Sequence, residues 1–335
     1  MKVLVTGGTG YVGQHLIRSL LDNPLFAELD LHYTHATSQP LPIPGNLGVK
    51  SHQLDITDKG AVDALVSAIM PDTIVHTAAF CNTGLCLKEP EKANSINVLG
   101  TTNVVAAAQS VGKKREKNVR LVHMSTDWVY SGKEMYCTEE TDCEGFGVYG
   151  KTKLAAERTV SSTCAKDAGV DSVILRSALI FGAPAPFTKK SSFLAWMVSA
   201  IKKGSKLELF DDEWRSAVYI LDVIASIRIA MQVVLSAEKE SKEEQEGKQT
   251  NFGIFNMGGA VRLNRLQMGN IIAKYLGFDG QGVTGVSLAA MGLASSRPAD
   301  LSMDSSRLCK TFGFTTRSFE EGIADCRQEL LAELC

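Results

Sequence analysis

A glycine-rich turn near the start of the chain restricts the possible folds more than any other feature of the sequence. Residues 6–13 read TGGTGYVG, between a β-branched run (KVLVT) and a stretch whose apolar residues recur at helical spacing. Gly7, Gly10 and Gly13 stand three residues apart. In such loops the first glycine permits a tight turn, the second lets backbone approach a pyrophosphate, and the third lets the helix pack close to the strand. Phosphate is also favoured by the free N–H groups and dipole at the helix start. Strand, glycine turn and helix in this order predict a dinucleotide-binding site.

Strands and helices alternate through the first half of the sequence. After the glycine turn we expect strands at LDLHYT, DTIVHTAA, VRLVHMST and DSVILRSALIFG, and helices at GAVDALVSAIM, NVLGTTNVVAAAQSV and TKLAAERTVSSTCAKD. Alternation of this kind indicates βαβ units and a parallel sheet that is covered by helices on both faces. The predicted fold class is therefore α/β, with a doubly wound parallel sheet of the Rossmann type.

The alternation stops after about residue 182. A proline-containing loop and two amphipathic helices follow, and a later strand (FGIFNMGG) and two helices are assigned to a smaller C-terminal part. We expect a nucleotide-binding domain at 1–182, extended by later segments such as 216–236, and a mainly substrate-binding α+β lobe at 183–335. The highly charged residues 237–250 are interpreted as a frayed helix end or a solvated loop.

Composition excludes several classes of partner. The chain has 335 residues, of which 44% are hydrophobic, a net charge of −2 and no basic block, so we expect neither nucleic acid nor a membrane surface as partner. No apolar run reaches the roughly 18–20 residues that span a bilayer. The start, MKVLVTGG, enters a strand without room for a signal peptide, and the eight cysteines show neither Cys-x-x-Cys nor a zinc spacing. We therefore expect a cytoplasmic protein with reduced thiols and no metal.

Further cofactor contacts are expected where the later strands end, because open α/β sheets bind ligands at the carboxyl ends of their strands. Asp55 follows the third expected strand and could accept a hydrogen bond from an adenine amino group; the alternative is a helix N-cap, for which Asp58 is better placed. Ala78 and Ala79 follow the fourth strand. Their small side chains would let the chain run close to a cofactor, but they also suit any tight packing.

The choice between NAD and NADP depends on the end of the second strand. NAD-binding proteins carry an acidic residue there, about 20 positions beyond the glycines, which bonds the ribose 2′-hydroxyl. In LDLHYTHAT, Asp30 lies too early, and Thr34 and His35 occupy the expected position. This leaves room for a 2′-phosphate, although no arginine marks one, and we predict NADP in preference to NAD.

The stretch VYGKTKLAAER places Tyr149 four residues before Lys153 in an expected helix. Residues four apart share a helix face by default, so the pair carries little information alone. It gains meaning from Ser125 and Thr126, which end the fifth strand at the edge where a nicotinamide would lie. A free tyrosine has a pKa near ~10 and is a poor base at neutral pH, whereas a nearby ammonium and an oxidised nicotinamide favour the phenolate.

These features together resemble the extended short-chain dehydrogenase/reductase family, and the resemblance covers essentially the whole chain. It implies that Tyr149 donates a proton in carbonyl reduction, or accepts one in alcohol oxidation. Lys153 would also bond the nicotinamide ribose, and Thr126, preferred to Ser125, would bond the substrate oxygen; Thr126, Tyr149 and Lys153 form the catalytic set. Asn97 in SINVLG matches the family's asparagine that helps to hold the site, although alone it would indicate a helix cap. Hydride comes from the cofactor, so no metal is required. The expected cofactor-binding residues are Gly7, Thr9, Gly10, Tyr11, Val12, Gly13, Thr34, His35, Asp55, Ile56, Ala78, Ala79, Asn97, Tyr149 and Lys153.

Within that family, the chain is most similar to the dTDP-4-dehydrorhamnose reductase type, through EPEKANSINVLGTTNV, STDWVYSG, VYGKTKLAAE, LRSALIFG and RPADLSMDSSRL. This subfamily implies NADPH-dependent reduction of the 4-keto group of a nucleotide sugar, and a homodimer is one expected assembly. The subfamily also contains the regulatory beta subunit of methionine adenosyltransferase, a binding protein that keeps the fold. The alternative function is therefore a non-catalytic, NADP-binding partner of that enzyme.

Two positions depart from the reductase pattern. The family's Arg-Thr-Ser-Trp after the sixth strand is RSAL here, so Leu179 replaces an aromatic residue that would contact the deoxysugar. His15 replaces a metal-binding glutamate of some bacterial members. Arg215 could meet a substrate phosphate or carboxylate, or pair with the neighbouring Asp211 or Asp212, and Arg297 leaves similar alternatives. The expected substrate-binding residues are Ser125, Leu179, Arg215 and Arg297.

Overall fold

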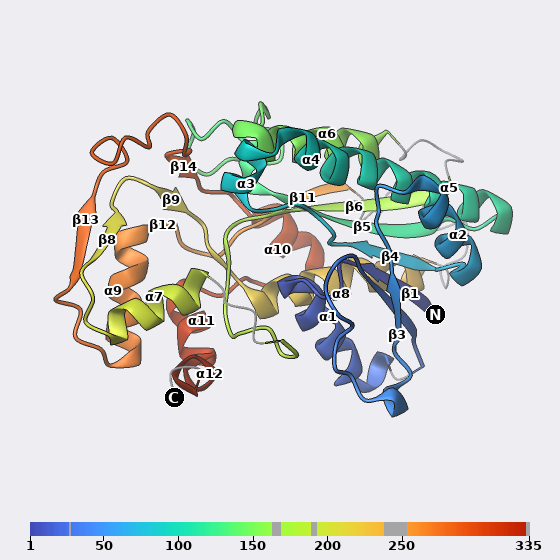
Figure 1. The fold of residues 1–335 in the computed structure, drawn as a ribbon, viewed down its shortest axis with the longest axis horizontal. Coiled ribbons are helices and arrows are strands. Elements are labelled where there is room, and N and C mark those ends of the chain that lie inside the picture. The colour runs from blue at the N-terminus through green and yellow to red at the C-terminus, as the bar shows by residue number, and fades with distance from the viewer. Residues whose placement is uncertain (27, 163–168, 189–192, 238–252, 333–335) are drawn as a thin grey trace.

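The computed structural model describes residues 1–26, 28–162, 169–188, 193–237 and 253–332. Within them, seven parallel strands form the main sheet in the order β11-β6-β5-β4-β1-β2-β3 (Figure 1). The order reverses between β1 and β4, and such a switch point is where open α/β sheets bind ligands. The strands are β1 (Lys2–Thr6), β2 (Asp30–His35), β3 (Lys50–Gln53), β4 (Thr73–His76), β5 (Val119–Thr126), β6 (Val170–Ser177) and β11 (Gly253–Met257).

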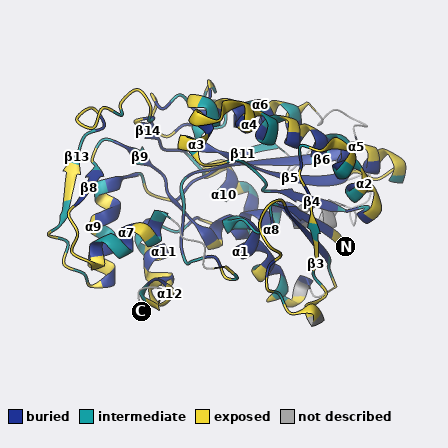
Figure 2. Cartoon of the chain, viewed as in Figure 1, coloured by how far each residue is buried: buried dark blue, intermediate teal, exposed yellow. Residues whose placement is uncertain are grey.

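Helices cover both faces of this sheet. Helices α2 (Lys59–Ile69), α5 (Thr101–Arg115) and α6 (Gly147–Ser161) lie on one face, and α1 (Tyr11–Leu21) and α8 (Ile220–Ala237) lie on the other, where α10 (Ser306–Phe312) packs against β11 (Figure 1). Every residue of β5 is buried as a consequence (Figure 2). Parallel strands that are covered on both faces read as apolar runs, which is why the sequence reveals them.

Short helical turns connect β4 to α5. They are α3 (Thr83–Lys88), α4 (Pro90–Asn94) and a π-helical turn (Ser95–Gly100) that leads directly into α5. Isolated π turns inside helices occur frequently at functional sites. This one carries Asn97.

A smaller lobe holds most of the C-terminal part (Figure 1). Strand β9 (Trp214–Arg215) pairs with β12 (Leu263–Asn264) and β14 (Asp300–Leu301), and β8 (Leu207–Phe210) pairs with β13 (Val283–Val286). A separate pair of short strands is formed by β7 (Ile180–Phe181) and β10 (Val218–Tyr219). The helices of the lobe are α7 (Phe193–Lys202), α9 (Arg265–Leu276), α11 (Phe319–Asp325) and α12 (Arg327–Ala332).

The predicted doubly wound parallel sheet with a smaller lobe is confirmed, with one correction. The strand of FGIFNMGG was assigned to the smaller part, but it is β11, the edge strand of the main sheet beside β6. A short apolar strand that follows a highly charged stretch carries no local signal of which sheet it will join. The charged stretch at 237–250 lies almost entirely outside the described residues, as only its first residue ends α8.

Two general features follow from the described parts of the chain. None of their helices has the length and apolar character that crossing a bilayer demands. The cysteines within those parts are all free thiols: Cys81, Cys86, Cys137, Cys143, Cys309 and Cys326.

Candidate functional site

The glycine turn is packed so closely that larger side chains would not fit. Gly7 has a φ of +71°, and a Cβ there would lie 2.8 Å from backbone atoms of Ala78. A Cβ on Gly13 would lie 2.6 Å from the carbonyl oxygen of Gly7. The glycine turn thus packs against the residues that follow β4. Helix α1 begins directly after the glycine turn, and its first turn carries no acidic residue. These features fit a dinucleotide, whose phosphates need bare backbone and free N–H groups at a helix start.

Thr34 and His35 lie at the end of β2 and are buried. The hydroxyl of Thr34 accepts a hydrogen bond from the Gly7 N–H (3.2 Å), so it stabilises the glycine turn from below. The residues that follow β2 are exposed. Among them, the Ser38 hydroxyl donates to the Thr9 hydroxyl at 2.8 Å. Ser38 was not singled out from the sequence, because it lies past the strand in an irregular segment.

The residues that follow β3 lie at the same edge of the sheet. The exposed Asp55 accepts hydrogen bonds from the N–H (2.9 Å) and hydroxyl (2.8 Å) of Thr57. Asp58 is the N-cap of α2, as the alternative interpretation required. Ile56 is buried and packs against the π turn at Gly100, where a Cβ would be only 2.6 Å from it.

Thr126 and Tyr149 meet because α6 starts against the turn that follows β5. A Cβ on Gly150 would lie 2.1 Å from the carbonyl oxygen of Trp128, so only glycine permits this approach. The Thr126 hydroxyl donates to Asp127 (3.0 Å) and accepts from the Trp128 N–H (3.3 Å). The Thr126 hydroxyl is close enough to the Tyr149 phenol to lower the pKa of that phenol.

The ionisation of Tyr149 differs from the simple expectation. Burial, the largest influence, raises the pKa of Tyr149 above its usual value, and the hydrogen bond to Thr126 opposes this only in part. The nearby charges of Cys81 and Asp127 raise this pKa further, and the lowering expected from Lys153 is not one of its main influences. The phenol holds its proton at neutral pH, which is the state that a proton donor requires.

Lys153 is buried in the same site. Its Nζ donates to the carbonyl oxygen of Met124 (2.7 Å) and lies 3.3 Å from Nε2 of His123. Burial lowers the pKa of Lys153 to about 8, although the nearby charges of Glu157 and Cys81 raise it. The side chain therefore remains an ammonium at neutral pH.

Asn97 does not cap a helix. Its side chain exchanges two hydrogen bonds with the backbone of Phe80 (2.8 and 3.1 Å) and donates to the Thr152 hydroxyl at 3.0 Å. Thr152 in turn donates to the carbonyl oxygen of Tyr149 (2.9 Å). Asn97 thereby ties the segment after β4 to the first turn of α6.

Ser125 points away from Thr126, as successive residues of a strand do. Its hydroxyl donates to the carboxylate of Glu157, which also receives hydrogen bonds from Arg176 (3.1 Å from Nε and 2.8 Å from Nη2). All three residues are buried. The structure therefore gives the Ser125 hydroxyl a partner inside the fold, whereas it was expected to contact substrate.

Three arginines of the smaller lobe surround one buried glutamate. Glu213 pairs with Arg215 (3.0 Å), Arg265 (2.6 Å) and Arg297 (2.7 Å). Burial alone would raise the pKa of Glu213, but these three guanidiniums lower it to about 2. Arg215 thus pairs with Glu213, and neither of the two expected aspartates, Asp211 and Asp212, is its partner among the ion pairs of the described residues. Arg265 was missed, because an arginine at the start of a helix carries no distinctive signal.

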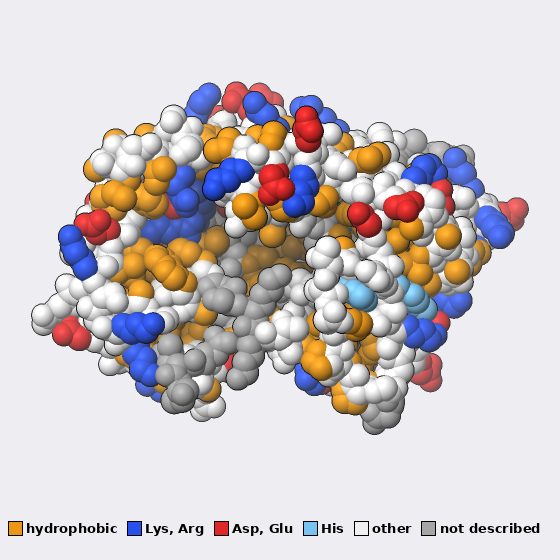
Figure 3. Space-filling model, viewed as in Figure 1, with side chains coloured by type: hydrophobic (Ala, Val, Ile, Leu, Met, Phe, Trp, Pro, Cys, Tyr) orange, Lys and Arg blue, Asp and Glu red, His pale blue; other side chains and the backbone are white. Residues whose placement is uncertain are grey.

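The side chains of the arginine cluster are exposed to different degrees. Arg215 is 1% exposed in its side chain and donates to the carbonyl oxygen of Pro298 (3.2 Å). Arg297 is 33% exposed. Figure 3 shows this face of the molecule hollowed between the lobes, with cationic side chains on the side of the smaller lobe. Leu179 follows β6 and is partly buried against the core.

Comparison with known proteins agrees with this architecture. The RmlD substrate binding domain family matches residues 1–332. The chain belongs to this family. One relative is a dTDP-4-dehydrorhamnose reductase from Aggregatibacter actinomycetemcomitans, 23% identical over 97% of this chain and 98% of the relative.

Solved structures with the same fold include two enzymes. UDP-glucose 4-epimerase from Thermotoga maritima, solved with UDP-glucose, superposes with a TM-score of 0.81 at 19% identity and covers 100% of both chains. A dTDP-4-dehydrorhamnose reductase from Bacillus anthracis, solved in complex with NADP, superposes with a TM-score of 0.76 at 23% identity over 98% of this chain and 99% of that one. The predicted family and fold are thereby confirmed.

Within this RmlD-type fold, Asp127 is a site residue that the sequence did not reveal. It is buried directly beside Thr126, and its Oδ2 has no hydrogen-bond partner in the described part of the chain. Burial raises the pKa of Asp127 to about 6, against the opposing charge of Arg215. Only the folded structure could show this, because the residue type at that position does not disclose its burial.

His15, where the family resemblance implied a metal-binding glutamate in some bacterial members, lies on α1. Its Nε2 lies 3.3 Å from the carbonyl oxygen of Ala183, and burial lowers its pKa to about 4. Over the ranges that the structure describes, no three His, Cys, Asp or Glu side chains gather as a metal site would require.

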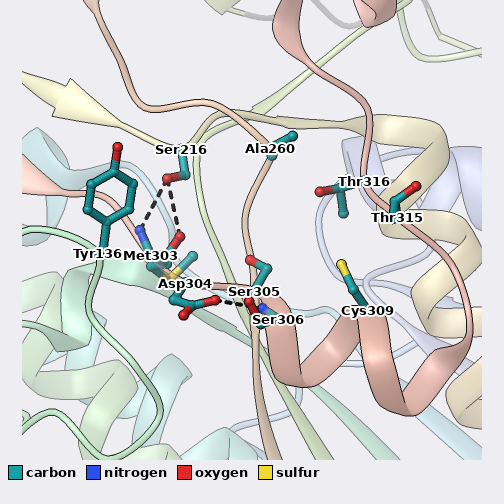
Figure 4. A pocket seen from close by; sticks show the side chains of 11 residues that line it. Tyr136, Ser216, Ala260, Met303, Asp304, Ser305, Ser306, Cys309, Thr315 and Thr316 are labelled. Carbon is teal, nitrogen blue, oxygen red and sulfur yellow. Dashed lines mark hydrogen bonds between the residues drawn. The ribbon is translucent and has the colours of Figure 1, made fainter.

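A cavity of about 420 Å³ lies outside the set of residues predicted for catalysis and cofactor binding (Figure 4). Thr316 points its hydroxyl into it, and the Ser216 hydroxyl forms part of its wall while bonding the backbone of Met303 (3.1 and 3.4 Å). None of the residues predicted for catalysis or cofactor binding lines it. The cavity is thus separate from the candidate active site.

Proposed function

We propose that this chain is an NAD(P)H-dependent reductase that reduces the 4-keto group of a nucleotide sugar. The observation that carries the proposal is the grouping of Thr126, protonated Tyr149 and cationic Lys153 beside the switch point of a dinucleotide-binding sheet. Relatives of the RmlD family that reduce such sugars share the fold, and one is solved with NADP.

The residues of this chain would act as follows. The bound nicotinamide supplies hydride. Tyr149 gives its hydroxyl proton to the carbonyl oxygen as the alcohol forms, and the Lys153 ammonium stabilises the phenolate that remains. Thr126 positions the substrate oxygen through its hydroxyl. A proton from solvent then restores the phenol, so that each turnover consumes one hydride and one proton.

Binding of the dinucleotide would involve the glycine turn and the edges of β2, β3 and β4. Support for NADP comes from the neutral, hydroxyl-bearing rim of Thr9 and Ser38, which offers donors and no carboxylate to a 2′-phosphate. Titration with NADPH and NADH, followed by fluorescence or calorimetry, tests this preference. Binding of neither nucleotide would refute the proposed cofactor site, and tighter binding of NADH would reverse the preference.

The arginine cluster supports an anionic substrate. Three guanidiniums face a single glutamate, so the cluster keeps a net positive charge beside the catalytic residues. Nη1 of Arg265 is buried and lacks a hydrogen-bond partner in the described ranges. The partly exposed Arg297 offers donors to the diphosphate of a nucleotide sugar, whereas the buried Arg265 contributes its charge. Measuring NADPH consumption across a panel of keto-sugar nucleotides would identify the substrate.

The alternative is a regulatory subunit that binds NADP and a methionine adenosyltransferase without turnover. It is favoured by Leu179 and His15, which both depart from the bacterial reductase pattern. Purification from the native source, with partners identified by mass spectrometry, separates the two functions. A stoichiometric adenosyltransferase complex that oxidises no NADPH with any carbonyl compound would establish the alternative; turnover of a keto-sugar would establish the reductase.

A further inference from the structure

A buried histidine lies directly behind the lysine of the candidate active site. His123 is the fifth residue of β5, is fully buried, and places Nε2 at 3.3 Å from Nζ of Lys153. The carbonyl oxygen of Met124 lies on the same ammonium at 2.7 Å. Two of the three N–H bonds of Lys153 therefore have acceptors from β5.

The surroundings of His123 keep it neutral. Burial lowers its pKa well below the usual 6.5, and the charge of Lys153 lowers it further. The neighbouring His76 of β4, whose ring lies 5.3 Å away, is also neutral, because burial lowers its pKa to about 3. A neutral imidazole beside an ammonium accepts through its bare nitrogen, so Nε2 is the acceptor and Nδ1 carries the proton.

The two histidines differ in how they are held. His76 uses both nitrogens, toward the hydroxyls of Thr6 (2.7 Å) and Thr101 (3.0 Å). His123 has no partner for Nδ1 among the residues that the structure describes, although this nitrogen is buried. A buried nitrogen without a partner is unfavourable, so a purely structural role would be served better by an apolar residue. Within the described ranges, the contact with Lys153 is the polar interaction of the ring that offsets this.

We propose that His123 is a positioning residue, whose neutral imidazole holds the Lys153 ammonium through Nε2 and directs its third N–H toward the cofactor side of the site. This rests on the proposed function only in so far as Lys153 faces a nicotinamide cofactor. The other titratable groups that act on Lys153 are Glu157 on α6 and Cys81 after β4, and both favour the ammonium.

Removal of the imidazole should shift the pKa of Lys153 in a predictable direction. An acceptor on the ammonium favours the charged form, so its loss makes Lys153 release its proton at a lower pH. The ammonium form, and the interactions that depend on it, are then lost at a pH where the wild-type protein retains them. A side chain that merely fills space would not change the pH at which this occurs.

The experiment compares His123→Leu with His123→Gln, whose amide oxygen restores an acceptor, and with His52→Leu as a control on β3. NADPH affinity is measured between pH 6 and 9.5. We expect the affinity of the Leu variant to fall at a pH about one unit lower than in the wild type, with roughly fivefold weaker binding at pH 8. The Gln variant should regain most of this, and the control should match the wild type. An unchanged pH midpoint in the Leu variant would overturn the proposal.

A second measurement needs no cofactor. The melting temperature of each variant is followed over the same pH range, because the contact stabilises only the ammonium form. The Leu variant should be destabilised more at pH 7 than at pH 9.5, and a difference that is constant with pH would show that His123 only packs. If the wild type binds no NADPH, the proposed function fails, while this comparison still decides the role of His123.

Discussion

At the scale of single residues, the site combines a protonated phenol, a buried ammonium and a buried carboxyl group within one short segment of the fold. Tyr149 and Lys153 owe their shifted pKa values mainly to burial, which penalises the charged form of each. A solvent-exposed tyrosine would also keep its proton at neutral pH. It would not, however, be held beside Thr126. The chemistry therefore depends on position more than on residue type.

Replacement of Tyr149 by Phe removes the proton donor and keeps the ring, which packs edge-on against Trp128 at 6.1 Å. We expect kcat to fall by roughly 10²–10⁴-fold, the usual contribution of a general acid. NADPH affinity should change little, which a parallel binding titration checks. Full activity of this variant would show that another group supplies the proton.

Replacement of Asp127 by Asn should reveal the buried carboxyl group. The pKa of Asp127 in the folded protein, about 6, lies above its ordinary value of 3.8. The contribution of Asp127 to stability is therefore fully present below pH 3.8 and is lost as the pH rises through 6. The difference of about two units corresponds to roughly 3 kcal/mol at pH 8. The Asn variant keeps the acceptor for Thr126 and removes this penalty. Its melting temperature, relative to wild type, should rise by several degrees between pH 4 and pH 8; a constant difference would contradict the shifted pKa.

At the scale of elements, the connection from β1 through the glycine turn to α1 is recognisable from the spacing of its glycines, although Gly7 is required by its contact with the distant Ala78. Each glycine occupies a place where a Cβ would meet backbone atoms, at Ala78 or at Gly7 itself. By contrast, the approach of α6 to the turn after β5 depends on Gly150, whose role is invisible without the fold. Loops that bind phosphate are recognisable because their glycines recur at a fixed spacing within a few residues.

The substitution Gly13→Ala tests the glycine turn. The new Cβ would lie 2.6 Å from the Gly7 carbonyl oxygen, so α1 must move away from the turn. We expect NADPH to bind at least about tenfold more weakly, equivalent to ~1.4 kcal/mol. The control is Gly60→Ala in the exposed first turn of α2, where a Cβ meets only a side-chain oxygen at 3.5 Å. That change should leave affinity unaltered and, since alanine favours helix, leave stability equal or slightly higher.

At the scale of the whole molecule, two lobes bring together groups that are far apart in sequence. Thr126 and Tyr149 come from the sheet domain, whereas Arg215, Arg265 and Arg297 come from three segments of the smaller lobe and are joined by Glu213. Arg215 and Arg265 act electrostatically on Asp127, the neighbour of Thr126, so the two sets lie near one another. The division of roles predicts separate effects on substrate and cofactor binding.

The substitution Arg297→Gln should act on the substrate alone. A charge-assisted hydrogen bond is worth about 1.5–3 kcal/mol, so KM for the nucleotide sugar should rise by roughly 10–100-fold. NADPH affinity should stay the same. Arg307→Gln is the control, because Arg307 pairs with Glu139 (3.7 Å) outside the cluster. An equal rise of KM in both variants would indicate a general electrostatic effect, and no rise in either would remove Arg297 from the substrate site.

The sequence by itself determined the parallel sheet, the glycine turn, the family and the chain positions of Thr126, Tyr149 and Lys153. These features are encoded by periodicity and short motifs, whose physical constraints act over a few neighbouring residues. Localisation, oligomeric state and the boundaries of the domains stay predictions.

Only the tertiary structure decided how the remaining polar side chains are used. It placed β11 in the main sheet, turned Ser125 toward Glu157, joined Arg215 to Glu213, buried Asp127 beside Thr126 and put His123 behind Lys153. Each of these depends on contacts between residues distant in the chain and on the degree of burial. A sequence pattern reports the periodicity of one segment, whereas hydrogen-bond partners and pKa values are set by whatever other segments pack against it.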